Sequence, residues 1–444
     1  MISGLVCILF NLYCHAFPLR TNFHPMAETL KTDALIIGGG VAGLWLLNRL
    51  RNAGYSAWLL EQDQLGTGQS IASQGIIHSG LKYVSDGTLN KAAASIADMP
   101  TRWRQCLDGN GEVDLQSCRV LSEQFYMLPG NSLRARLLSF LGSKALASKT
   151  ASLPAKDYPD LFRNHVSGPL YRIADFVLDV PSLLATLCAN HTDAVFSIDW
   201  QQAHLDKDPQ GKITGLQFND GPRIEASHYV FCCGGGTTSL LQDLDLPDVP
   251  MQRRPLQQVM VRHQTSDPAF VHCVSSRVDL TPELTITTHT NNQGQPVWYL
   301  GGRLAEDGVG MAPDLLIDSA RSKLKKLFPW CDFSKAQWAT LDIDRAEARQ
   351  PDGRRPENAS MITRDNLAVC WPTKLTMAPA LADRVLSYIE SNGTIPGGNT
   401  ASPAPTFLSR PHVAATPWEN LRVWPLCAHC RVRTYPFQPW DWAR

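Results

Sequence analysis

A glycine-rich turn at residues 33–43 carries the clearest chemical signal in the sequence. The segment reads DALIIGGGVAG, and its glycines form the pattern G-x-G-x-x-G at Gly38, Gly40 and Gly43. In such a pattern the first glycine permits a tight turn, the second lets the backbone approach a pyrophosphate, and the third lets a helix pack closely on a strand. The residues therefore predict a site for the phosphates of a dinucleotide.

An acidic residue after the next predicted strand extends this site. The apolar run 34–37 reads as a buried parallel strand, and the helix expected over 41–53 presents its N-terminal N–H groups to the phosphates. A second strand over 56–60 ends at Glu61, about twenty residues beyond the glycines, where a carboxylate can accept hydrogen bonds from ribose hydroxyls. The alternative is a glycine-rich turn in some other α/β protein.

The composition limits the classes of protein to which the chain can belong. The chain has 444 residues, of which 44% are hydrophobic, so it can bury a large core and form two interleaved domains. Lys and Arg together number 41, as do Asp and Glu, and this balance gives no reason to expect a nucleic-acid partner. The 12 cysteines are scattered and do not resemble a disulfide scaffold, so we expect a cytoplasmic protein.

The first 31 residues are expected to form an N-terminal extension outside the fold. The run 2–17 is apolar, but it is short for a membrane span and has no basic residue before it. Met26 lies shortly before the first predicted strand, so the folded part can begin there. A signal peptide or an anchor is the alternative, and it would make the protein exported or membrane-associated.

Later segments suggest a second contact with the cofactor and a second sheet. The glycines at 234–236 follow a predicted strand and would let the backbone pass close to the same cofactor. Strand-like segments at 259–263, 284–289 and 297–300 predict an antiparallel sheet in a second domain.

The end of the chain completes the expected order of domains. A strand at 367–371 and a helix at 378–390 return to the first domain, and the following Gly-, Pro-, Ser- and Thr-rich composition predicts low order. The expected parts are an extension at 1–31, a cofactor-binding domain at 32–100, 176–250 and 346–390, a cap or substrate segment at 101–175, a substrate domain at 251–345 and a tail of low order at 391–444.

Five motifs together resemble the D-amino-acid-oxidase-like (DAO) family of FAD-dependent oxidoreductases. They are the glycine turn with Glu61, ASQGIIHSGLKY at 72–83, CCGGG at 232–236, GRRP at 353–356 and TKLT at 373–376. The resemblance covers about 32–390 and is greatest to the glycerol-3-phosphate dehydrogenase and L-2-hydroxyglutarate dehydrogenase groups. Trp371-Pro372 departs from the family pattern, which has a pair of glycines before Lys-Leu-Thr.

The resemblance implies a fold and a cofactor. The fold is α/β: a Rossmann-like FAD-binding domain, with a parallel sheet and helices, is interleaved with a smaller α+β substrate domain that has an antiparallel sheet. The pyrophosphate of FAD would lie at the first glycine turn. The residues expected to bind FAD are Gly38, Gly40, Gly43, Glu61, Ser73, Gln74, Gly75, Gly80, Gly234, Gly236, Thr373, Leu375 and Thr376.

Four further residues are candidates for the chemistry itself, and we expect no metal site. The imidazole of His78 is suited to take a hydroxyl or amine proton from a substrate, although it could instead hydrogen-bond the loop or the flavin. The guanidinium groups of Arg303 and Arg355 can clamp a carboxylate or a phosphate, or else form salt bridges. Lys374 can neutralise charge on the flavin or the substrate, or else be a solvated lysine.

The sequence thus predicts an FAD-dependent dehydrogenase or oxidase. Its small-molecule substrate would be an alcohol or amine of 2-hydroxyacid, glycerol-phosphate or amino-acid type, oxidised by hydride transfer to flavin N5, with oxygen or a quinone as electron acceptor. An amine oxidase that releases peroxide, and a protein in which FAD has a structural or partner-binding role, are the alternatives. The basic helix expected at 319–328 leaves membrane association open but does not favour it.

Overall fold

The described part of the chain runs from residue 29 to residue 423. The computed structural model describes this range except for 81–83, 86–87, 90–95, 131–149, 220, 247–248, 265–266, 275–281, 398–401 and 420. The predicted extension therefore lies outside the described residues apart from 29–31, and so does the predicted tail beyond 423. Within the described residues, no helix is long and apolar enough to cross a membrane.

Strands from both ends of the described chain build an eight-stranded sheet. They are β1 (Thr29–Ile37), β2 (Ala57–Glu61), β11 (Val195–Ser197), β12 (Ala203–Lys207), β13 (Ile213–Phe218), β14 (Arg223–Phe231), β20 (Ser360–Arg364) and β21 (Leu367–Trp371). The strands β11, β2, β1, β14 and β21 pair in parallel in this order, and β12, β13 and β20 join antiparallel. Residues 34–37 are buried, as expected for a parallel strand covered on both faces.

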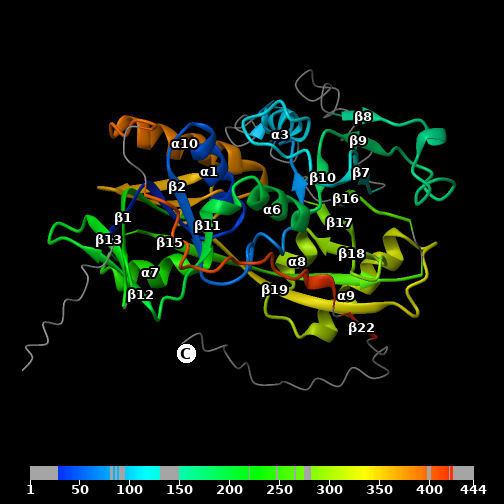
Figure 1. The fold of residues 1–444 in the computed structure, drawn as a ribbon. Helices are drawn as coiled ribbons and strands as arrows, with labels where there is room; N and C mark the ends of the chain where they lie inside the picture. Colours follow the sequence, from blue (N-terminus) through cyan, green and yellow to red (C-terminus); the bar gives the residue numbers. More distant parts are fainter. Residues whose placement is uncertain are drawn as a thin grey trace, which may run out of the picture.

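Helices cover both faces of this sheet. They are α1 (Val41–Asn52), α6 (Val180–Ala189), α7 (Thr237–Asp243) and α10 (Ala378–Ser391). Figure 1 shows α1 and α10 side by side above the sheet and α7 below it. Asp179 begins α6 by accepting a hydrogen bond from the Ser182 N–H at 3.2 Å, and Pro181 occupies its first turn, where a missing N–H costs nothing.

A nine-stranded sheet forms the second large layer. In spatial order its strands are β22 (Arg422–Val423), β19 (Gln337–Ala348), β15 (Met251–Arg262), β18 (Pro296–Gly301), β17 (Pro282–Thr290), β16 (Val271–Val274), β7 (Phe125–Pro129), β9 (Tyr171–Ile173) and β8 (Thr150–Ser152). All neighbours are antiparallel except β7 and β16. The predicted combination of a parallel sheet with helices and an antiparallel sheet is confirmed.

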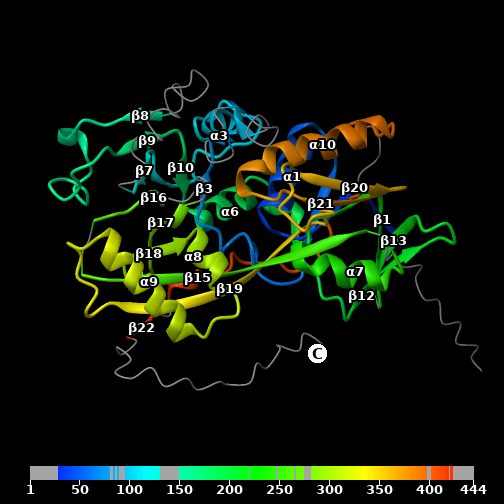
Figure 2. The same cartoon turned by 180° about the vertical axis from the view of Figure 1, so that it is seen from behind.

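The two faces of the nine-stranded sheet differ in character. Side chains alternate along a strand, so Val259, Ile286 and Leu300 share one face, where they form a core with α9 (Pro313–Leu327) and α8 (Arg303–Asp307). His272 and Thr285 lie opposite each other on the other face. Figure 2 shows β15 and β19 extending from this sheet toward the eight-stranded one, where Arg253 on β15 hydrogen-bonds the carbonyl of Gly235 at 2.9 Å.

Shorter elements fill the space beside the two sheets. A three-stranded sheet has the order β3 (Ile76–Ile77), β10 (Phe176–Leu178) and β6 (Val120–Ser122), and α3 (Met99–Leu107) packs beside β3. The remaining short elements are the hairpin β4 (Val84–Ser85) and β5 (Thr88–Leu89) and the 3₁₀ turns η3 (Ala155–Asp157), η4 (Thr192–Ala194), η5 (Gly234–Gly236), η6 (Leu375–Met377) and η7 (Pro417–Glu419).

The C-terminal residues 402–423 differ from the low order that their composition predicts. Trp418 is 1% exposed and stacks on His289 with ring centroids 4.3 Å apart, and β22 pairs with β19. Backbone hydrogen bonds also join Leu65 to His412 and to Ala414, at 2.7 and 3.0 Å. Tertiary contacts therefore order a segment whose proline- and serine-containing sequence predicts no regular element. A second difference concerns β19, which continues to Ala348, past the expected boundary at 345.

Candidate functional site

The predicted glycine turn joins β1 to α1. Gly38 has a φ of +111°, and a Cβ added to it would lie 2.6 Å from the carbonyl oxygen of Cys232. A Cβ on Gly43 would lie 2.0 Å from the carbonyl oxygen of Gly38, and one on Gly40 would lie 3.0 Å from the Ser70 hydroxyl. Close approach of backbone to backbone therefore requires glycine at the first and third positions of the motif.

Glu61 closes one side of this turn. Its Oε2 accepts a hydrogen bond from the Gly39 N–H at 2.5 Å, and its Oε1 accepts one from the Asp63 N–H at 2.9 Å. Burial raises the pKa of Glu61, and the hydrogen bonds from Asp63 and Gly39 oppose that rise. The carboxylate is thus held directly beside the turn, where the sequence predicts it.

The second glycine cluster lies beside the first. The Cys232 N–H donates to the carbonyl of Ile37 at 2.7 Å, so the end of β14 adjoins the end of β1. The cluster follows as η5, in which Gly234 has a φ of +52°. A Cβ on Gly234 or Gly236 would meet no described atom closer than 3.6 Å, so packing among the described residues does not account for these glycines.

The segment 72–80 contains the other predicted loop residues. The hydroxyl of Ser73 is buried and has no hydrogen-bond partner among the described residues. A Cβ on Gly75, whose φ is +70°, would lie 2.1 Å from the carbonyl of Leu178, so this glycine is required by its packing against β10. Gly80 has a φ of +87° and is buried.

His78 belongs to a buried cluster with Asp175 and His272. The Nδ1 atom of His78 lies 2.8 Å from Oδ2 of Asp175, and Nε2 of His272 lies 3.8 Å from the same oxygen. Burial would raise the pKa of Asp175, but the imidazoles of His272 and His78 hold it well below its usual range. Asp175 is therefore an ionised carboxylate between two histidines. The loop between β9 and β10 contributes Asp175, and β16 contributes His272.

The TKLT motif meets the histidine loop. The hydroxyl of Thr376 accepts a hydrogen bond from the backbone N–H of His78 at 2.9 Å, and the Thr376 carbonyl accepts one from Nε1 of Trp103 at 3.0 Å. Leu375 and Thr376 lie in η6, directly before α10, and Thr373 adopts a φ of +64°. Two predicted motifs almost 300 residues apart are thus brought together.

Gln74 connects this loop to the nine-stranded sheet. Its Nε2 donates to the carbonyl of Tyr299 at 2.8 Å and lies 3.3 Å from Oγ1 of Thr287. The hydroxyl of Tyr299 in turn lies 2.8 Å from the carbonyl of Ala72 and 2.5 Å from Oε1 of Gln258. The polar face of the sheet therefore packs directly on the segment that carries His78.

The predicted cationic residues lie at the borders of this region. Arg303 begins α8 after Gly302, whose φ is +80°. Arg355 is half-buried in the loop between β19 and β20. The ammonium of Lys374 lies 3.5 Å from the carbonyl of Glu357, in the same loop.

An arginine that the sequence motifs do not contain lies between these elements. Burial and the charge of Arg254 lower the pKa of Arg345 to about 10. The charge of Glu347 opposes that shift, and so does Glu306 on the helix that Arg303 begins. The charge of Arg355 makes the smallest of the named contributions to lowering this pKa. Part of this positive charge is balanced, because Nε of Arg254 lies 2.7 Å from Oε2 of the buried Glu347.

The residues of the turn fit the cofactor that the sequence predicts. The first and third glycines have no room for a Cβ, which suits a turn whose backbone approaches a pyrophosphate. Two N–H groups of the turn donate to side chains, that of Gly39 to Glu61 at 2.5 Å and that of Val41 to the Ser70 hydroxyl at 3.1 Å. The Glu61 carboxylate and the buried Ser73 hydroxyl offer hydrogen-bonding groups nearby, and the Ser73 hydroxyl is unused by described residues. FAD contact by the individual residues stays a prediction.

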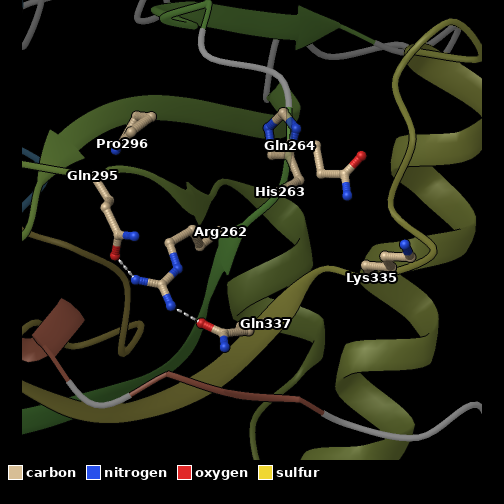
Figure 3. A pocket seen from close by; sticks show the side chains of 7 residues that line it. All are labelled: Arg262, His263, Gln264, Gln295, Pro296, Lys335 and Gln337. Atoms are coloured by element: carbon tan, nitrogen blue, oxygen red, sulfur yellow. Dashed lines mark hydrogen bonds between the residues drawn. The ribbon is translucent and has the colours of Figure 1, made fainter.

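A cavity at the opposite end of β15 is separate from this site. It has a volume of about 320 Å³ and is lined by Arg262, His263, Gln264, Gln295, Pro296, Lys335 and Gln337 (Figure 3). The guanidinium of Arg262 donates to the side-chain carbonyls of Gln295 and Gln337. Met251 and Arg262 are the two ends of β15, which has twelve residues, and this corresponds to about 35 Å along a strand.

Three functional candidates have no signal in the sequence motifs. Asp175, His272 and Arg345 are single residues in strands or strand-connecting loops. Asp175 is 97 residues from His78, and no fixed spacing or glycine pattern marks it. A buried polar residue within an apolar run is the one signal that could have drawn attention to Asp175 and His272.

Comparison with known proteins places the chain among flavoproteins. The DAO model, described as FAD dependent oxidoreductase, matches residues 33–385. The probable FAD-dependent oxidoreductase PA4991 of Pseudomonas aeruginosa is 43% identical over 396 residues, which are 89% of this chain and 99% of that protein.

Solved structures give the same result for the fold. The crystal structure of PA4991 has a TM-score of 0.76 at 39% identity and covers 88% of this chain and 99% of that one. The dithionite-reduced L-alpha-glycerophosphate oxidase of Mycoplasma pneumoniae, with FAD bound, has a TM-score of 0.60 at 14% identity. That likeness covers 84% of this chain and 97% of the oxidase.

Proposed function

Because the chain belongs to the DAO family of FAD-dependent oxidoreductases, we propose that it oxidises a small anionic substrate at a carbon that carries an alcohol or an amine. The protein is an enzyme and FAD is its cofactor. The identity of the substrate and the role of each residue below belong to the proposal.

The bound flavin supplies the redox chemistry by accepting a hydride from the substrate carbon. The residues that would hold it are the glycines of the first turn, with Glu61 beside them and η5 next to them. The N-terminal end of α1 contributes a positive dipole toward the phosphates. The protein's own contribution to the reaction is to orient the substrate, to neutralise its charge and to take up a proton.

His78 is the residue proposed to take up that proton. The observation that carries this assignment is its position: its backbone is held by Thr376 at 2.9 Å and its Nδ1 by Asp175 at 2.8 Å. An imidazole held at both points has a fixed orientation, which general base catalysis requires. A substrate hydroxyl or ammonium group would transfer its proton to Nε2, on the opposite edge of the ring.

The arginines near β19 support an anionic substrate. The charge of Arg355 makes a small contribution to lowering the pKa of Arg345, and an anion bound beside Arg355 would offset that repulsion of like charges. A guanidinium can hold a carboxylate or phosphate through two parallel hydrogen bonds. We therefore assign the substrate a carboxylate or phosphate group and give Arg355 the role of its anchor.

Anaerobic reduction of the flavin tests this function. The FAD-loaded protein would be mixed without oxygen with 2-hydroxyacids, glycerol-3-phosphate and amino acids in separate samples. The proposal expects at least one of these anionic compounds to bleach the oxidised flavin, and its uncharged analogue to do so poorly. Bleaching by none of them contradicts the proposal and favours a structural role for FAD.

Admission of oxygen to the bleached sample then identifies the electron acceptor. Rapid return of the flavin colour with release of peroxide would make the enzyme an oxidase, and an amino-acid substrate would further make it an amine oxidase. Slow return that a soluble quinone accelerates would make it a dehydrogenase. Both outcomes are compatible with the proposed oxidation of the substrate.

A further inference from the structure

The carboxylate of Asp175 receives hydrogen-bond donors on both of its oxygens. Oδ1 accepts from the backbone N–H of Ser79 at 2.7 Å and from the Ser79 hydroxyl at 2.6 Å. Oδ2 lies 2.8 Å from Nδ1 of His78 and 3.8 Å from Nε2 of His272. Asp175 is 3% exposed, so water contributes little to its solvation. The two oxygens therefore have different partners: Oδ1 binds Ser79 in the loop after β3, and Oδ2 faces the imidazoles of His78 and His272.

His272 is a second buried imidazole directed at the same oxygen. It is 2% exposed, and its Nδ1 lies 2.9 Å from the hydroxyl of Thr285 on β17. Its ring lies against Phe125, with centroids 4.5 Å apart, and is nearly parallel to the ring of His78, with centroids 6.1 Å apart and 19° between the planes. The sheet thus fixes His272 at an angle that points Nε2 toward Asp175.

We propose that Asp175 and His272 are positioning residues that control the protonation of His78. The carboxylate of Asp175 fixes the tautomer of His78 with hydrogen on Nδ1, so that Nε2 accepts the substrate proton. His272 lies against the same carboxylate oxygen and thereby limits the basicity of His78. This inference rests on the proposed role of His78 as base. Neither Asp175 nor His272 touches the reacting atoms.

The proton balance of this arrangement is simple. The substrate O–H or N–H bond breaks and its proton forms a new N–H bond at Nε2 of His78, while the Nδ1–H bond stays directed at Asp175. The resulting imidazolium is stabilised by the carboxylate at 2.8 Å. The proton returns to solvent from Nε2 after the product leaves, so no further reactant is needed.

Few other charged groups face His78 in the described part of the chain. The adjoining strand β10 and turn η6 contain no titratable side chain. The arginines of α3 are paired elsewhere, Arg102 with Asp383 and Arg104 with Glu123. Asp175 and His272 are the titratable side chains that the structure places against the His78 ring.

The Asp175→Asn variant makes a specific prediction about the tautomer. The Ser79 N–H needs an acceptor, so the amide oxygen of the asparagine would face Ser79 and its NH₂ group would face Nδ1 of His78. An NH₂ donor requires Nδ1 to be an acceptor, and this moves the hydrogen of the neutral ring to Nε2. His78 would then have the wrong tautomer for accepting a substrate proton.

The test is nitrogen NMR of the FAD-loaded protein with ¹⁵N-labelled histidine, with the His78 signals assigned by their loss in His78→Asn. We expect neutral His78 to carry hydrogen on Nδ1 in the unmodified protein and on Nε2 in Asp175→Asn. Asp179→Asn is the matched control, since Asp179 is also buried and four residues away but caps α6. It should leave the His78 tautomer unchanged.

His272→Phe tests the second half of the proposal. Phenylalanine keeps an aromatic ring against Phe125 but removes the imidazole nitrogen that lies 3.8 Å from Oδ2 of Asp175, so the carboxylate charge acts on His78 alone of the two histidines. The titration of His78 should then move to higher pH by about one unit. This variant retains the Asp175 carboxylate, so it tests the influence of the cluster on His78 even if Asp175→Asn does not fold or does not bind FAD.

Several results would overturn the inference. An unchanged His78 tautomer in Asp175→Asn, or a His78 titration that His272→Phe leaves in place, contradicts it. The ligand atoms of the three residues lie within 4.8 Å of one another, so one equivalent of bound metal found by elemental analysis of the FAD-loaded protein would also contradict it. The NMR measurement uses no substrate, so a failure of the substrate panel to bleach the flavin would refute the proposed function alone.

Discussion

Arg355 and Arg354 are adjacent in the chain but differ in their surroundings. The side chain of Arg354 is 86% exposed and lies 3.7 Å from Asp352, whereas Arg355 is half-buried and its charge acts on Arg345. The loop between β19 and β20 thus exposes one of these side chains and partly covers the other. Arg355 is the residue proposed to anchor the substrate.

Replacement of Arg355 by methionine should therefore raise KM for the anionic substrate by about a hundredfold and change kcat much less. The expected size is that of one lost charge-assisted contact, about 2–3 kcal/mol. Steady-state kinetics measures both constants. Arg354→Met is the matched control and should leave KM unchanged, and equal effects of the two replacements would contradict the assignment.

Glu61 should govern the affinity for FAD. Replacement by glutamine removes a charged hydrogen-bond acceptor and should weaken FAD binding by about tenfold to a hundredfold. Burial raises the pKa of Glu61, so the carboxylate takes up a proton at a higher pH than an exposed glutamate does, and FAD affinity should fall as pH drops through that range.

Fluorescence titration of the apoprotein with FAD at several pH values measures this dependence. Glu225→Gln, which alters a partly exposed glutamate on β14, is the control and should bind FAD as the unmodified protein does. A Glu61→Gln variant with unchanged affinity, or with the same pH dependence, would contradict the role of Glu61.

Among individual residues, the sequence predicts those that belong to motifs and misses those that lie outside any motif. Gly38, Gly43 and Glu61 can be predicted because their spacing along one strand, turn and helix is itself the signal. Asp175 and Arg345 reach the site through pairing between strands that are far apart in the chain. Their place beside the other site residues cannot be predicted until the register of those strands is known.

Among the elements, the C-terminal segment 402–423 has the least expected position. It runs as an ordered strap from the eight-stranded sheet, where the Ser197 N–H donates to the carbonyl of Ser409 at 2.8 Å, to β22 on the nine-stranded sheet, where its large buried anchor is Trp418. The Trp418 side chain packs with Met260, Val297 and Tyr299, and its Nε1 donates to the carbonyl of Thr290 at 3.2 Å. The strap therefore supports β17 and β18, the strands whose Thr287 and Tyr299 contact Gln74.

Trp418→Ala should lower the free energy of unfolding by about 3–5 kcal/mol, as expected for a fully buried aromatic residue. Urea denaturation followed by circular dichroism measures the change. Ile395→Ala is the control from the same end of the chain, because Ile395 is 71% exposed, and it should cost less than about 0.5 kcal/mol. Similar values for the two variants would show that the strap does not support the fold.

The sequence predicts elements well where their periodicity is strong. The strand at 367–371 and the helix from 378 are found where the pattern places them, because continuous apolar burial and a buried helical face leave clear signals. The strap could not be predicted, because its order comes from contacts with distant segments: the burial of Trp418, backbone hydrogen bonds to Leu65 and Ser197, and pairing with β19. The continuation of β19 to Ala348, past the boundary expected at 345, could not be predicted either, because the end of this strand is set by its pairing with β15.

The molecule as a whole contains buried histidines that should make its stability depend on pH. Burial lowers the pKa of His263 and of His289 to about 4 each, against an unfolded value of about 6.5. The unfolded chain therefore binds more protons than the folded protein between these values. Stability is complete above about pH 6.5 and falls as the pH drops toward 4, by up to about 1.4 kcal/mol per pH unit for each histidine.

His289→Gln should make this dependence less steep. Glutamine can keep a hydrogen bond to the Thr287 hydroxyl, which lies 2.9 Å from Nε2 of His289, but it does not titrate. Urea denaturation at pH values between 4.5 and 7.5 measures the slope. His204→Gln is the control, because that side chain is 58% exposed, and it should leave the slope unchanged. An equal slope in all three proteins would contradict this account.

The two large sheets and the three-stranded sheet bring together the glycine turn at 38–43, the loop that carries His78, and the strands β15 and β19. The central claim is that this assembly oxidises its substrate with His78 as base. The most direct test is the rate constant of anaerobic flavin bleaching, measured by stopped flow in the unmodified protein and in His78→Asn. We predict that His78→Asn keeps its FAD and bleaches about 10²–10⁴ times more slowly. Equal rate constants in the two proteins, at matched FAD content, would contradict the claim.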